Sequence, residues 1–187
     1  MTPSRCWTLT ALLLLGPQAV AYAELNTEET HVLATLHHSN QVQIDAGSLA
    51  TSHARSGKVR QYGEQLIKDH QQADGILRSY ARRAGVTIQE PPMARSEAEH
   101  QDAEEDAAAM QRLRGLDGAA FDRAFLNCMV NDHRNGLQLV RNARSQISDP
   151  RLRSMLDNLL PVLQQHLTLA QKLQREAAAA PASSRER

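Results

Sequence analysis

The chain has 187 residues with 21 basic and 21 acidic side chains, eight histidines and few aromatics, namely one Trp, three Tyr and two Phe. Balanced charge and so few stacking side chains exclude nucleic acid as the main partner. The length suits one domain with a sizeable core, which must be built from aliphatic side chains.

The N-terminal segment 1–23 has the pattern of a cleaved export signal, so we expect a periplasmic or secreted protein. Arg5 supplies a positive start, the stretch 7–15 is apolar, and small residues at 21–23 suit cleavage. The apolar stretch is far shorter than the ~20 residues of a membrane-spanning helix, so we expect no transmembrane segment after cleavage. The mature chain then keeps one cysteine, Cys128, which we expect to be a small core residue.

Helical periodicity and the scarcity of β-branched runs predict four long helices. Thr27 is the expected N-cap of the first helix, Gly85 should end the second, and Asp149 followed by Pro150 should begin the fourth. The predicted helices cover residues 28–55, 58–84, 119–147 and 150–175.

These helices predict an all-α fold, a ferritin-like antiparallel four-helix bundle over residues 24–176, followed by a disordered tail, 177–187. The connection between the second and third helices, 85–118, is long enough to cross the length of the bundle. We expect its acidic, alanine-rich part, 95–113, to be partly helical, with the charge run 97–106 as its solvated face. This part is also where an unknown protein partner would bind if the protein is an envelope interaction module.

Polar residues interrupt the apolar faces near the middle of the predicted helices. Asn40 and Gln43 do so in the first, His70 in the second, His133 in the third and His166 in the fourth. Because the midpoints of antiparallel helices of equal length lie at one level, we expect three imidazoles and one or two amides to face one another. The remaining helical histidines, His37, His38 and His53, lie off these faces or near a helix end, and we expect them at the surface.

Three roles suit this polar level. A hydrogen-bonded layer that sets the register of the helices is the leading expectation. The alternative is a mononuclear metal site in which His70, His133 and His166, with Gln43 as a weaker ligand, bind one Zn, Cu, Ni or Fe ion. A third role is a pH switch, because protonated imidazoles would repel one another.

Asp69 and Asp132 directly precede two of these histidines. Each points about 100° away from its own imidazole, so it would accept an N–H from a histidine on a neighbouring helix. The competing interpretation is that each aspartate lies at the edge of the bundle and pairs with arginine.

Patterns typical of catalysis do not appear, so we expect no enzymatic activity. The sequence has no phosphate-binding glycine loop and no nucleophile elbow, and its Glu-x-x-His matches, at Glu28 and Glu97, lie away from the other candidate ligands. Pro161 should kink the fourth helix just before His166.

The chain resembles an exported bacterial family, the domain of unknown function 4142, over about residues 28–173. The matching motifs are Gln43-Ile44-x-x-Gly47-x-Leu49-Ala50, Val59-Arg60 through Asp69-His70, Phe121-Asp122 leading to Met129-Val130-x-Asp132-His133, and Leu160-Pro161-x-Leu163-x-x-His166-Leu167. The resemblance implies a periplasmic or secreted ferritin-like bundle with no established activity. The family usually has Glu where this chain has Gln43, which counts against a metal site that uses that carboxylate.

Overall fold

A computed structural model describes residues 24–179, and within this range the fold is all-α, as predicted, with no strand. The export signal predicted at 1–23 and residues 180–187 of the predicted tail lie outside the described residues. The five helices are α1 (Thr27–His53), α2 (Gly57–Arg83), α3 (Glu97–Arg114), α4 (Gly118–Gln146) and α5 (Pro150–Ala179).

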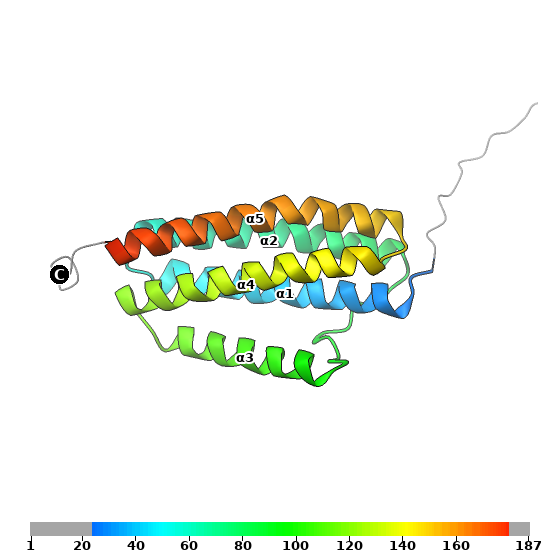
Figure 1. Ribbon diagram of the computed structural model, residues 1–187, viewed down its shortest axis with the longest axis horizontal. Helices are drawn as coiled ribbons and strands as arrows, with labels where there is room; N and C mark the ends of the chain where they lie inside the picture. The colour runs from blue at the N-terminus through cyan, green and yellow to red at the C-terminus, as the bar shows by residue number, and fades with distance from the viewer. Residues whose placement is uncertain (1–23, 180–187) are drawn as a thin grey trace, which may run out of the picture.

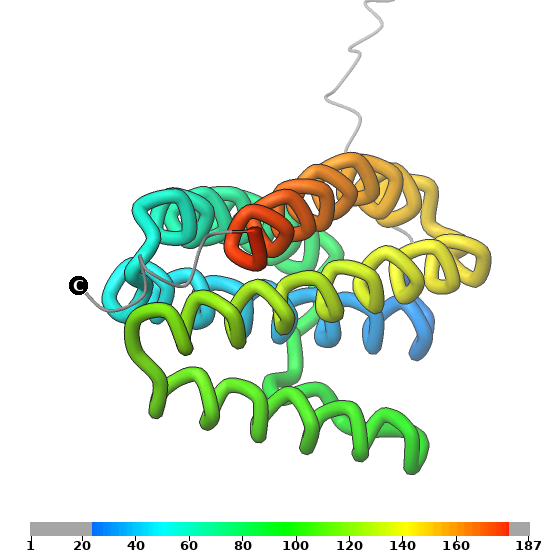
Figure 2. Tube along the Cα trace, turned by 60° about the vertical axis from the view of Figure 1, so that its left-hand side comes forward, coloured from blue at the N-terminus to red at the C-terminus, as the bar shows by residue number. Residues whose placement is uncertain are grey.

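Four long helices, α1, α2, α4 and α5, lie side by side (Figure 1). The shorter α3 lies outside this group and contacts α1 and α4. Short turns join α1 to α2 and α4 to α5, so that each pair is a helical hairpin (Figure 2). The connection between the two hairpins contains α3, as expected for its acidic part. Its residues 97–106 are exposed apart from the partly buried Glu99.

Helix ends follow local side-chain chemistry. The predicted N-cap of α1, Thr27, is wrong by one residue, because Asn26 forms a reciprocal capping box with Glu29. Asn26 Oδ1 accepts from Glu29 N at 2.9 Å, and Glu29 Oε2 accepts from Asn26 N at 3.0 Å, a geometry that requires Glu three residues after the cap. At the other end, α5 continues to Ala179, beyond the predicted helix end at residue 175.

The two remaining predicted helix signals are present. Gly85 follows the last residues of α2 with φ +70°, and the amide of Val86 donates to the carbonyl of Ala81. Asp149 Oδ1 accepts from the backbone amides of the first turn of α5 at 2.8 Å. Pro161 lies inside α5, which continues on both sides of it.

The apolar core consists of two clusters of buried side chains, one toward each end of the long helices. On α1 the polar residues Asn40 and Gln43 lie between Leu36 of one cluster and Ala46 of the other. On α2, His70 lies in the same way between Leu66 of one cluster and Leu77 of the other. A polar level therefore crosses the interior. Within residues 24–179, no helix combines the length and hydropathy that a bilayer crossing requires.

Candidate metal centre

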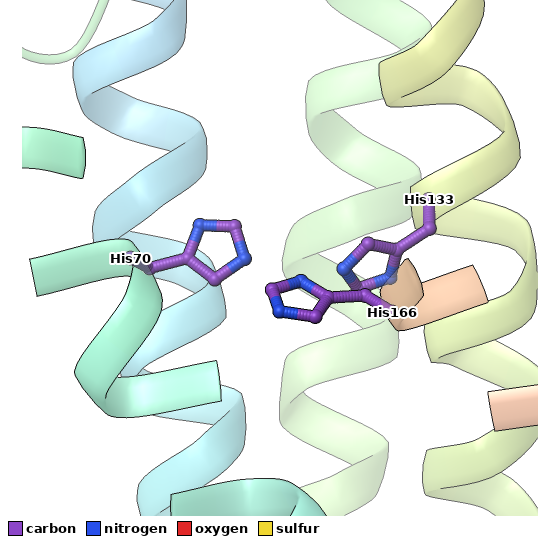
Figure 3. A group of neighbouring side chains, drawn as sticks. All are labelled: His70, His133 and His166. Carbon is purple, nitrogen blue, oxygen red and sulfur yellow. The ribbon is translucent and has the colours of Figure 1, made fainter. Parts of the chain in front are cut away.

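Three histidines from three different helices meet in the interior. His70 lies on α2, His133 on α4 and His166 on α5, and each offers one ring nitrogen that lies within 4.8 Å of the other two (Figure 3). Their ring centroids are 5.2 to 6.1 Å apart. The residues are only 7 %, 2 % and 0 % exposed, so the group is shielded from solvent.

One nitrogen of each of the first two rings donates a hydrogen bond away from the group. His70 Nδ1 donates to Oδ1 of Asn40, on α1, at 2.8 Å. His133 Nδ1 donates to the carbonyl oxygen of Met129, one turn earlier on its own helix, also at 2.8 Å. Because both partners are acceptors, both rings are fixed as Nδ1–H tautomers with the lone pair on Nε2.

His166 has the opposite tautomer. Its Nε2 donates to Oδ2 of Asp69, on α2, at 2.9 Å, which leaves the lone pair on Nδ1. The three remaining nitrogens, Nε2 of His70, Nε2 of His133 and Nδ1 of His166, are buried and have no hydrogen-bond partner. The group therefore presents three acceptor nitrogens to one another.

Burial keeps two of these rings neutral. Desolvation, followed by repulsion from the other two rings, lowers the pKa of His70 from 6.5 to about 3. Desolvation also lowers the pKa of His133, to about 4, against the opposing effect of its bond to Met129. Both lone pairs are therefore free of protons at neutral pH.

The group fits a small transition-metal ion. Imidazole nitrogens bind zinc at about 2.0 Å, and a point equidistant from three nitrogens 4.8 Å apart lies about 2.8 Å from each. Each ring needs to move inward by less than about 1 Å to reach bonding distance. Imidazole is a suitable ligand for Zn, Cu, Ni and Fe.

The two aspartates predicted to accept an N–H from a histidine of a neighbouring helix differ. Asp69 does so, whereas Asp132 does not bond to a histidine. Asp132 Oδ2 accepts from Gln43 Nε2 at 3.1 Å and from Cys128 Sγ at 3.5 Å, because its side of α4 faces the amide of α1. Gln43 is thus bound to a carboxylate, and its Oε1 is buried without a partner.

Burial alters the acidity of the two α4 side chains in this contact. Desolvation, followed by repulsion from Asp106, raises the pKa of Asp132 to about 6. Desolvation, followed by the negative charge of Asp132, raises the pKa of the Cys128 thiol to about 12. Cys128 is partly buried and protonated, which agrees with its expected role as a packing residue rather than a nucleophile.

Histidines expected at the surface are instead partly buried and contact the connection between the hairpins. His37 lies between Asp74 and Glu90, with Nε2 at 3.1 Å from Glu90 Oε2. His53 Nδ1 lies 2.7 Å from Asp117 Oδ1. Spacing alone placed these residues off the core face, and their partners could be identified only from the path of the connection.

A protein-family model, the Domain of unknown function (DUF4142), matches residues 15–173. No curated protein sequence matches the chain. Two solved structures share its helical fold at 14 % identity. One is described as secreted protein DUF305 from Streptomyces coelicolor, with a TM-score of 0.67 over 81 % of this chain and 93 % of that one. The other is CopM in the Cu(II)-bound form, with a TM-score of 0.61 over 80 % of this chain and 96 % of that one.

Proposed function

This chain belongs to the DUF4142 family, and we propose that it is an exported helical protein that binds one transition-metal ion between His70, His133 and His166. One observation carries the proposal: each of these buried histidines offers a ring nitrogen within 4.8 Å of the other two, and each ring has one buried nitrogen without a hydrogen-bond partner. Neutral imidazoles arranged in this way are the ligands that Zn, Cu, Ni and Fe accept.

The direction of the hydrogen bonds supports a metal site over the purely structural layer. In a structural layer, at least one imidazole N–H would donate to a neighbouring ring. Here all three N–H groups donate outward, to Asn40, Met129 and Asp69. Three buried acceptors without donors are costly for folding, and an ion that bonds to all three removes that cost.

The comparison with CopM suggests copper as the ion, because that similar structure is in the Cu(II)-bound form. The likeness itself extends to the fold alone. The chemistry of the donor set is compatible with copper, since imidazole is a common copper ligand.

We also propose that the four long helices form the ferritin-like antiparallel bundle that the sequence predicts. Its support is the chain direction in Figure 1, where α1 and α5 run one way and α2 and α4 the other. Export is supported by the signal pattern in residues 1–23 and by the likeness to a secreted protein. The proposed role is binding rather than catalysis.

The test is metal analysis of the mature chain purified without a histidine tag, before and after dialysis against Cu, Zn and Ni. We expect one equivalent of metal in the wild type and none in a variant with alanine at His70, His133 and His166. A matched control replaces three histidines outside the group, His31, His53 and His100, and should retain the metal. Absence of metal from the wild type, or equal loss in both variants, would refute the proposal.

A further inference from the structure

We propose that the three-histidine site selects a monovalent ion, Cu(I), over divalent ions such as Zn(II), and that Asp69 balances its charge. This inference rests on the proposed metal site and specifies which ion the site binds. Its basis is the number of charges that the protein places around the three rings.

The donors themselves carry no charge. Of the three hydrogen-bond partners that orient the rings, the Asn40 amide and the Met129 carbonyl are neutral, and only Asp69 is a carboxylate. Cu(I) together with Asp69 therefore gives a net charge of zero for the ion and the groups bonded to the rings. Zn(II) in the same place leaves one positive charge that no ring-bonded carboxylate balances.

Burial makes this difference large. His166 is 0 % exposed and His133 2 %, so an ion between them is removed from bulk water. The cost of moving an ion from water into such a medium rises with the square of its charge, so a divalent ion costs about four times as much as a monovalent ion of the same size. The bonds to the three rings offset part of this cost for either ion, and an opposite charge nearby offsets the rest.

The number of ligands points the same way. Within residues 24–179 the group contains three residues, and no fourth His, Cys, Asp or Glu joins it. Zn(II) in proteins is almost always four-coordinate, so it would need a water molecule in addition to the three rings. Cu(I) has the same filled d shell as Zn(II) but a single charge, and it accepts trigonal coordination, so the three rings alone complete its set of ligands.

The experiment compares affinities in the untagged wild-type protein under anaerobic conditions. Cu(I) is titrated in competition with a colorimetric Cu(I) chelator, and Zn(II) in competition with a fluorescent zinc chelator. We expect one tightly bound Cu(I) and at least 100-fold weaker binding of Zn(II). Ag(I), which is monovalent and redox-inert, should bind like Cu(I).

The charge argument is tested with Asp69→Asn. The amide oxygen can still accept from His166 Nε2, so the variant removes the charge and keeps the hydrogen bond. Because the Coulomb energy is proportional to the charge of the ion, the logarithmic loss of affinity for Zn(II) should be about twice that for Cu(I). Glu64→Gln, at an exposed position on α2, is the matched control and should change neither affinity.

The outcomes separate the two proposals. Zn(II) binding as tightly as Cu(I), or equal losses for both ions in Asp69→Asn, would overturn the monovalent preference and leave the metal site intact. If neither Cu(I) nor Zn(II) binds to a correctly folded wild type, the metal site itself is wrong. Far-UV circular dichroism of each variant establishes folding.

Discussion

Gly47 and Gly63 face each other across α1 and α2 at a distance that leaves no space for a side chain. A Cβ on Gly47 would lie 2.7 Å from the carbonyl oxygen of Gly63, and a Cβ on Gly63 would lie 2.7 Å from the carbonyl oxygen of Gly47. Two turns away along both helices, Asn40 bonds to His70 at 2.8 Å. The close packing of α1 and α2 therefore also sets the contact that orients a candidate ligand.

Gly47→Ala should destabilise the protein by about 1–3 kcal/mol, because backbone must move to admit the methyl group. The matched control is Gly75→Ala on the same hairpin, where a Cβ meets nothing within 4 Å. That change should stabilise the protein by up to about 1 kcal/mol through helix propensity. Thermal and urea unfolding of both variants test this pair, and equal effects would contradict the packing argument.

Glu29 should be among the most important buried polar residues for stability. It is 2 % exposed, caps α1, and its Oε1 accepts from the backbone amides of Ser148 and Asp149 at 2.8 Å. Glu29→Ala leaves three amides without their acceptor and should cost about 3 kcal/mol or more. Its neighbour Glu28, which pairs with Arg95 near the surface, should cost less than about 1 kcal/mol when replaced by alanine. Urea unfolding distinguishes the two values.

The metal-free protein should lose stability as the pH falls from about 6.5 toward 4. The folded-state pKa values of His70 and His133 are lowered to about 3 and about 4, so in this window the unfolded chain binds protons that the folded chain does not. Each residue contributes a loss of up to about 1.4 kcal/mol per pH unit. His133→Leu should reduce the slope of unfolding free energy against pH. An unchanged slope would contradict the assigned environment.

Asp132 changes the stability of the protein with pH in the opposite direction. Its pKa is raised from 3.8 to about 6, so its ionised form costs stability above pH 6, and this cost disappears as the pH falls toward 4. Asp132→Asn should therefore be about 2 kcal/mol more stable than the wild type at pH 8 and about equal to it at pH 4. The difference between the two urea-unfolding curves isolates this residue, because the histidines titrate equally in both proteins.

Cys128 should resist thiol reagents in the folded protein at pH 8. Its pKa of about 12 leaves almost no thiolate, and the side chain is partly buried. Reaction with a disulfide reagent should be slow in buffer and fast in 8 M urea, followed by absorbance. Rapid modification of the folded protein would show that the thiol is exposed and activated.

Helical spacing was sufficient to predict the group of three histidines, because His70, His133 and His166 lie near the middle of helices of similar length. The aspartates show the limit of this reasoning. Asp69 and Asp132 have the same local pattern, yet only Asp69 bonds to a ring, since the outcome depends on how each helix is rotated against its neighbours. The Met129 carbonyl was missed because a backbone acceptor leaves no trace in the sequence.

The contacts between the connection and the long helices could not be predicted either. Glu90 and Asp117 reach His37 and His53 of α1 only through the particular path that the connection takes outside the long helices. Loop geometry of this kind depends on turns and packing that periodicity does not report. The prediction of an acidic, solvated helix in the connection needed only local composition, and the structure has that helix as α3.

The three histidines belong to both halves of the chain. His70 comes from the α1–α2 hairpin, and His133 and His166 come from the α4–α5 hairpin. An ion held by all three would be a reversible cross-link between hairpins that no internal disulfide joins, and its contribution to stability would grow with the logarithm of the free ion concentration. The melting temperature of the protein would then serve as a gauge of metal supply.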